Sequence, residues 1–367
     1  MKRLLYCAGA LLVAACATNT AKTEADVPTL KDHFADDFLV GVAVNQNQVN
    51  GLDPKADSIT RLHFNSIVAE NCMKSEVIHP EEGRWDWAAA DSFVDYGVSN
   101  GMKVIGHTLI WHSQLAPWFA VDSAGNPVTP EVLKARMKEH ITTIMQRYKG
   151  RILGYDVVNE AILDDGTYRP SPFYQILGEE YIPLAFQYAM EADSTAELYI
   201  NDYSMASPAK REVYVRIVND LCRRGLRVDA VGIQAHMGMD YPDFAELEKS
   251  IEAYAATGAK VMFTEMDMSA LPTVSSSANI SDRVAYEKAM NPYPDGLPDS
   301  VAAVWNARMD TVMSMLLRHR DVVTRVNWWG THDGMSWKND FPVKGRTEYP
   351  LAFDRDYNLK PFLKDKL

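Results

Sequence analysis

Cysteine is scarce in this chain, with four among 367 residues, at Cys7, Cys16, Cys72 and Cys222. So few cysteines cannot form the disulfide framework that holds many small secreted domains together. Cys72 follows a predicted strand and Cys222 falls late in a predicted helix, so we expect both to be small buried apolar residues and not a structural disulfide. The fold must therefore depend on a hydrophobic core, which a chain with 47% hydrophobic residues can form.

Positive charge is also in short supply, because 37 Lys and Arg residues face 49 Asp and Glu residues, for a net charge of −12. Loss of residues 1–15, which hold Lys2 and Arg3, would change the net charge from −12 to −14. An acidic surface argues against nucleic acid and polyanionic partners and is compatible with a neutral polysaccharide.

The apolar run at residues 4–15 is too short to span a bilayer as a helix. It follows Lys2 and Arg3 and ends in small residues before Cys16, an arrangement that resembles a bacterial lipobox. We therefore expect residues 1–15 to be a lipoprotein signal peptide, Cys16 to be lipidated, and residues 16–35 to form a flexible tether. An ordinary secretory signal with an incidental cysteine is the alternative. The expected location is the cell envelope after export, anchored by lipid in the outer membrane.

From about residue 38 onward, short apolar strands alternate with amphipathic helices, and no sequence repeat or second domain is evident. Helix starts are marked by Thr129 before Pro130 and by Ser207 before Pro208, and Gly225 marks a helix end. The pattern predicts an α/β fold, a single (β/α)8 TIM barrel over residues 36–367. The eight expected strands are 38–44, 65–70, 103–109, 154–160, 197–201, 230–236, 260–265 and 325–329.

Polar or aromatic residues end seven of these strands, from the second to the eighth. In chain order they are Glu70-Asn71, His107, Asn159-Glu160, Asn201-Asp202, Gln234 with His236, Glu265 with Asp267, and Trp329. Catalytic side chains of (β/α)8 enzymes gather at the carboxyl ends of the strands, so the sequence predicts an active site there.

Two of these residues, Glu160 and Glu265, each end an apolar strand in a carboxylate. Retaining hydrolysis of a glycosidic bond needs two facing carboxyl groups, one as acid/base and one as nucleophile. The anionic nucleophile is expected to raise the pKa of its partner, which keeps the acid protonated. Two salt-bridged surface glutamates would be the alternative, but strand ends beside apolar runs fit that poorly.

Several segments resemble the signature segments of glycoside hydrolase family 10, in the order of that family from about residue 36 to the C-terminus. They include residues 70–74, 106–114, 156–160, 232–236, 264–267, 291–300, 329–337 and 345–361. The resemblance implies a retaining endo-β-1,4-xylanase on a (β/α)8 barrel, acting on xylan and xylo-oligosaccharides. We expect a monomer that needs no cofactor or metal.

The resemblance also implies roles for individual residues. Glu160 would be the acid/base, Glu265 the nucleophile, and Asn159 would bond the 2-hydroxyl of the sugar beside the scissile bond. Four further residues would support the pair. His236 would position Glu265, and Asp267 would fix the His236 ring. Gln234 would support Glu160, and Asp156 would join the same network.

Substrate-binding residues follow from the same resemblance. Those expected on the glycone side are Glu70, Asn71, Lys74, His107, Trp111 and Gln114, with Trp329 and Trp337 as aromatic floor and roof. Strand alternation predicts that Trp328 points away from the site, while Trp85, Trp87 and Trp305 are expected in the core. A zinc site at His107 and His112 is rejected, because the spacing places the two rings on opposite faces of a strand.

Two other functions remain open at this point. One is a retaining β-1,4-glucanase or cellulase on the same scaffold, and the other is a surface lipoprotein that binds xylan without catalysis. Both carboxyl groups and their supporting residues are present, which counts against a decayed active site.

Overall fold

The computed structural model describes residues 28–274 and 287–367. The predicted signal peptide, the lipidation residue Cys16 and most of the predicted tether lie outside these ranges. In the two described ranges, none of the helices has the length and apolar character needed to cross a membrane.

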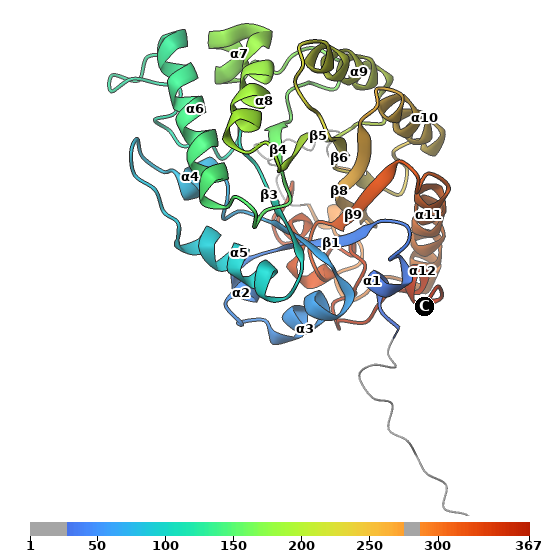
Figure 1. The fold of residues 1–367 in the computed structure, drawn as a ribbon. Coiled ribbons are helices and arrows are strands. Elements are labelled where there is room, and N and C mark those ends of the chain that lie inside the picture. The colour runs from blue at the N-terminus through green and yellow to red at the C-terminus, as the bar shows by residue number, and fades with distance from the viewer. Residues whose placement is uncertain (1–27, 275–286) are drawn as a thin grey trace, which may run out of the picture.

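A closed parallel barrel forms the centre of the molecule (Figure 1). Its strands are β1 (Leu39–Val44), β2 (Ser66–Ala69), β3 (Lys103–Gly106), β4 (Gly154–Asn159), β5 (Glu197–Asp202), β6 (Ala230–Ile233), β8 (Lys260–Ser269) and β9 (Val323–Trp328). Neighbouring strands pair in this order, β6 pairs with β8, and β9 pairs with β1, which closes the ring. The short strand β7 (His236–Gly238) pairs with the last residues of β8, beyond the part of β8 that pairs with β6. The predicted (β/α)8 architecture is confirmed.

Helices surround the barrel (Figure 1). They are α1 (Leu30–His33), α2 (Gln46–Val49), α3 (Pro54–His63), α4 (Ser75–Ile78), α5 (Ala88–Ser99), α6 (Pro130–Arg147), α7 (Pro172–Leu177), α8 (Tyr181–Ala192), α9 (Pro208–Arg223), α10 (Phe244–Ala255), α11 (Asp299–Arg318) and α12 (Pro361–Lys364). The predicted start of α6 is confirmed, since the Thr129 side chain accepts from the Val132 amide and Pro130 is the first helical residue. α9 likewise begins at Pro208, and Gly225, with φ of 77°, follows its end.

Apolar side chains pack in two layers. The larger cluster fills the space between the strands and the helices, while a small cluster inside the barrel includes Val68, Ile105, Tyr199 and Trp329. Trp328 is fully buried in the outer layer, so the two adjacent tryptophans point to opposite sides of β9, as alternation predicts. This alternation leaves the polar strand ends free to face the barrel mouth.

The folded part of the chain begins before residue 36, which corrects the predicted boundary. α1 lies within the predicted tether, and Leu30 and Phe34 are fully buried in the outer core. A helix of four residues is too short to show an apolar period in the sequence, so no local pattern marks the start of the folded part.

Smaller expectations were wrong in informative ways. Cys222 is exposed on α9, whereas Cys72 is buried as expected, and both are free thiols. The sixth predicted strand is interrupted, because Ala235 adopts a φ of 58° between β6 and β7. Trp305 is a core residue, but Trp85 and Trp87 are only half-buried and stack on each other with ring centroids 4.8 Å apart.

Candidate active site

The carboxyl ends of the strands surround a cavity of about 450 Å³. Thirteen predicted site residues line it: Glu70, Asn71, Lys74, His107, Trp111, Gln114, Asn159, Glu160, Gln234, His236, Glu265, Trp329 and Trp337. Asp156 and Asp267 are fully buried and contact residues that line the cavity. The structure therefore brings together every predicted site residue that it describes, and only Cys16 lies outside the described ranges.

Both strands that carry the glutamates lose their regular register just before or at the carboxylate. The β4–β5 pairing shifts between Asp156 and Val158, and the β8–β9 pairing shifts between Phe263 and Met266. A shift of this kind changes the direction in which the following side chains point. Glu160 itself adopts a φ of 55°, a left-handed conformation that costs a residue with a side chain about 1–3 kcal/mol. Its N–H donates to the Asn201 carbonyl over 2.9 Å.

The Glu160 carboxyl is buried and accepts two hydrogen bonds. Gln234 Nε2 donates to one oxygen over 3.1 Å, and the Trp111 indole donates to the other over 2.8 Å. Burial raises the pKa of Glu160, and the charge of Asp202 raises it further. The charge of Glu265 also raises this pKa, as expected from the sequence, but it is a smaller cause than burial and Asp202.

The Glu265 carboxyl is equally buried, but its pKa is shifted in the opposite direction from that of Glu160. Burial alone would raise the pKa of Glu265, but the hydrogen bond from His236 and further favourable contacts hold this pKa below its ordinary value. Asn201 Nδ2 donates to Glu265 Oε1 over 2.9 Å, and His236 Nε2 lies 3.2 Å from Oε2.

His236 lies between two carboxylates. Its Nδ1 is 3.0 Å from Asp267 Oδ2, and its Nε2 contacts Glu265. Burial would lower the pKa of His236, but the charges of these carboxylates and the hydrogen bonds to them raise it to about 9. Trp337 also donates to Asp267 over 2.9 Å, and the Lys338 ammonium lies 3.5 Å from Asp267. At neutral pH the ring is therefore a cation that donates from both nitrogens.

A run of side-chain amides connects the two glutamates. The Asn159 amide lies 2.9 Å from Asn201 Nδ2 and 3.3 Å from Gln234 Nε2. Asn201 also contacts Glu265, and Gln234 contacts Glu160. The two carboxyl groups thus face the same cavity with Asn159 between their supporting amides.

One end of the cavity is polar. Lys74 Nζ donates to Asn71 over 2.9 Å and to Gln114 over 2.7 Å, and it lies 5.0 Å from the centre of the Trp111 ring. Next to this group, His107 Nδ1 is 2.8 Å from Asp156 Oδ2. Amide, ammonium and imidazole groups of this kind can bond the hydroxyl groups of a sugar.

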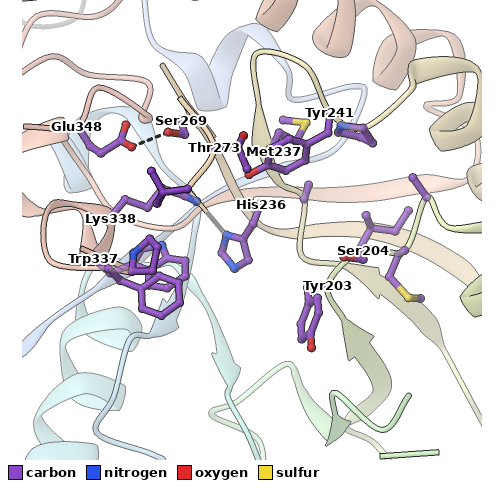
Figure 2. A pocket seen from close by; sticks show the side chains of 18 of the residues that line it. Tyr203, Ser204, His236, Met237, Tyr241, Ser269, Thr273, Trp337, Lys338 and Glu348 are labelled. Atoms are coloured by element: carbon purple, nitrogen blue, oxygen red, sulfur yellow. Dashed lines mark hydrogen bonds between the residues drawn. The ribbon is translucent and has the colours of Figure 1, made fainter. Parts of the chain in front are cut away.

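A second cavity of about 410 Å³ adjoins the first and shares His236, Trp337 and Phe341 with it. Figure 2 shows this cavity, with Tyr203 and Trp337 on either side of His236. The second cavity therefore continues the site beyond His236 and Trp337.

Sequence reasoning assigned no individual role to four residues that shape the site. Asn201 and Asp202 stand at a polar strand end, which is a signal that could have assigned them roles. Arg169 and Lys338 belong to segments outside the strands, and no local pattern marks them. In the described ranges, no cluster of His, Cys, Asp or Glu could hold a metal ion, and burial lowers the pKa of His112 to about 3.

Comparisons with known proteins point to one family. The family model for glycosyl hydrolase family 10 matches residues 29–366. Endo-1,4-beta-xylanase A from Xylanibacter ruminicola is 46% identical over 364 residues, which cover 98% of this chain and 97% of that protein. An endo-1,4-beta-xylanase from Geobacillus stearothermophilus is 37% identical over 345 residues, 91% of this chain and 96% of that protein. A solved structure of an endoxylanase from a sugarcane soil metagenome superposes with a TM-score of 0.88 at 41% identity, covering 92% of this chain and 99% of the other.

Proposed function

Because the chain belongs to glycoside hydrolase family 10, we propose that it is an endo-β-1,4-xylanase that hydrolyses internal bonds of xylan with retention of configuration. The observation that carries the proposal is that two buried carboxyl groups in one cavity have pKa values shifted in opposite directions. The pKa of Glu160 is raised and that of Glu265 is lowered. One group is then protonated and the other ionised at the same pH, which is the state that double displacement needs.

In the first step, Glu265 attacks the anomeric carbon as the bond to the leaving oxygen breaks. Glu160 gives its proton to that oxygen, so the departing sugar leaves as a neutral alcohol. The His236 cation holds Glu265 ionised and oriented, since its Nε2 lies 3.2 Å from Oε2. A covalent glycosyl ester on Glu265 results.

In the second step, formation of the ester removes the charge of Glu265. This charge is one of the causes that raise the pKa of Glu160, so Glu160 becomes more acidic and stays ionised. The Glu160 carboxylate takes a proton from water as the water oxygen bonds to the anomeric carbon and the ester bond breaks. Two inversions give net retention.

The walls of the cavity suit a xylose unit. Trp329 and Trp337 line it with broad indole faces, on which the C–H groups of a sugar can stack. The polar end offers Lys74, Asn71 and Gln114 to hydroxyl groups. Initial rates on xylan and on carboxymethylcellulose test the substrate class, and equal rates on both would contradict the preference for xylan.

We also propose that the protein is exported and held at the cell envelope by lipid on Cys16, in the outer membrane. The support is the short apolar run that ends in Val13-Ala14-Ala15-Cys16 after Lys2 and Arg3. Incorporation of labelled fatty acid into the wild type and its loss in Cys16→Ala, with the xylanase released from the membrane fraction, are the expected results. Membrane retention of Cys16→Ala would contradict the proposal.

Trapping of the glycosyl ester tests the chemistry. A 2-fluoro-xylobioside with a good leaving group should glycosylate the Glu265 carboxylate and release that leaving group, because fluorine slows the second step more than the activated first one. Mass spectrometry of a proteolytic digest should locate the added mass on the peptide that contains Glu265. Glu265→Ala is the matched control and should gain no mass. An adduct on another residue, or none on the active wild type, would rule out the assigned nucleophile.

A further inference from the structure

Arg169 is a buried arginine that contacts the backbone of the acid/base residue. Its Nε donates to the Glu160 carbonyl over 2.8 Å, and its own N–H donates to the Ala161 carbonyl over 2.8 Å. Within residues 28–274 and 287–367, no carboxylate lies within 4.0 Å of its guanidinium. Arg169 therefore acts here as a hydrogen-bond donor of fixed geometry more than as an ion-pair partner.

The conformation that Arg169 contacts is one that needs support. Glu160 has a φ of 55°, which a residue with a side chain keeps only when its surroundings impose it. The N–H of Glu160 donates to the Asn201 carbonyl, and its carbonyl accepts from Arg169. These two bonds fix the peptide groups on both sides of the Glu160 side chain, and with them the direction of its carboxyl group.

The other end of the same guanidinium reaches the neighbouring cavity. Its Nη2 donates to the Tyr203 hydroxyl over 2.6 Å, and the Tyr203 ring also lies 3.9 Å from the Lys210 ammonium. Tyr203 lines the second cavity, as Figure 2 shows. One planar group thus connects the Glu160 peptide to the wall of the cavity beside the glutamate pair.

We propose that Arg169 is a positioning residue that holds the Glu160 carboxyl in line with the leaving oxygen and couples it to Tyr203. This inference rests on the proposed retaining hydrolysis. It predicts a defect in proton transfer and not in binding, because Arg169 contacts Glu160 through the backbone and is not among the residues that line the two cavities.

Leaving groups that differ in their need for a proton separate these possibilities. Arg169→Met should lower kcat/KM on xylan by about 100-fold, the loss expected when a catalytic group is misplaced by about 1 Å. On 2,4-dinitrophenyl β-xylobioside, whose phenolate leaves without protonation, kcat/KM should fall by less than about threefold. Azide should raise kcat of Arg169→Met on this substrate, because azide breaks the Glu265 ester and bonds to the anomeric carbon without a general base.

Three further variants complete the design. Arg169→Lys keeps the charge but loses the planar guanidinium whose two separate nitrogens contact Glu160 and Tyr203, and Tyr203→Phe removes one partner, so both should show a smaller loss of the same selective kind. Arg223→Met, at an arginine whose side chain is 70% exposed, should behave as wild type.

An equal loss on both substrates, or no loss on xylan, would overturn the inference. If Arg169→Met does not fold, as judged by circular dichroism, the inference is tested with Arg169→Lys and Tyr203→Phe, by comparing their loss of kcat/KM on xylan with that on the dinitrophenyl substrate. Failure of the wild type to release reducing sugar from xylan would instead overturn the proposed function, independently of Arg169.

Discussion

Glu160 and Glu265 have the same side chain and nearly the same burial, yet their pKa values move in opposite directions. The difference comes from their neighbours. Glu160 faces the charge of Asp202 and neutral donors, whereas Glu265 faces the His236 cation. The sequence was sufficient to identify this pair, because each glutamate ends an apolar run. It could not show the effect of Asp202, which depends on how β4 and β5 pack.

Replacement of Trp111 tests which contacts set the pKa of Glu160. The Trp111 N–H bonds a Glu160 oxygen and favours the ionised form, so Trp111→Phe should raise the pKa of Glu160. The alkaline limb of the pH profile of kcat/KM reports loss of the Glu160 proton and should move to higher pH, by up to about one unit. The acidic limb, which reports protonation of Glu265, should stay in place. An alkaline limb that moves to lower pH would contradict this account.

The charge on His236 contributes to stability as well as to catalysis. Its pKa is about 9 in the folded protein and 6.5 as the ordinary value, so the folded state holds the proton more tightly. Its stabilising contribution is therefore complete below pH 6.5 and is lost as pH rises through 9. In that window the free energy of unfolding should fall by about 1.4 kcal/mol per pH unit from this group.

Urea denaturation at several pH values between 6.5 and 9 measures this slope. His236→Gln should flatten it relative to wild type, since the titrating group is gone. An unchanged slope in the variant would show that other groups cause the alkaline loss.

At the scale of elements, α4 and α6 are joined by a histidine pair with the opposite dependence. His140 on α6 is fully buried, and its Nδ1 lies 3.1 Å from Nδ1 of His79, which ends α4. Burial, with a smaller effect of His79, lowers the pKa of His140 to about 3. The unfolded chain binds the proton first as pH falls below 6.5, so stability is lost in that direction.

His140→Gln should therefore reduce the loss of stability between pH 6.5 and 4, by about 1.4 kcal/mol per pH unit at most. Unfolding by urea at pH 7 and at pH 5 gives the comparison, with the wild type and His236→Gln as references. If the wild type and His140→Gln lose the same free energy between these pH values, the pair does not titrate as described.

The elements also show where sequence reasoning reaches its limit. Apolar runs and caps predicted the barrel strands and the starts of α6 and α9. The register shifts in β4 and β8 and the break at Ala235 were not predicted, because they depend on pairing with the next strand and not on local composition. Those irregular positions are the ones that set the direction of the catalytic side chains.

For the whole molecule, the segment that precedes β1 is part of the outer core. Leu30 and Phe34 of that segment are fully buried, and the Phe34 ring stacks on Phe38 with centroids 5.2 Å apart. A chain that begins at residue 36 should lose at least about 3 kcal/mol of unfolding free energy, the usual cost of removing one large buried side chain.

The chain that begins at residue 28 is the matched control and should unfold at the same urea concentration as a chain that begins at residue 16. Equal stability of the two shortened chains would show that α1 is dispensable. Phe34→Ala in the longer chain should reproduce most of the loss, which would assign it to packing.

The register shifts beside the two glutamates have a consequence for building hybrids from related barrels. Each shift belongs to a pair of adjacent strands, β4 with β5 and β8 with β9, so a transplanted single strand would bring only one side of it. A seam through α9 leaves each pair intact within its own half. Exchange of half-barrels at that helix should therefore keep both glutamate side chains directed into the cavity, whereas exchange of individual strands should not.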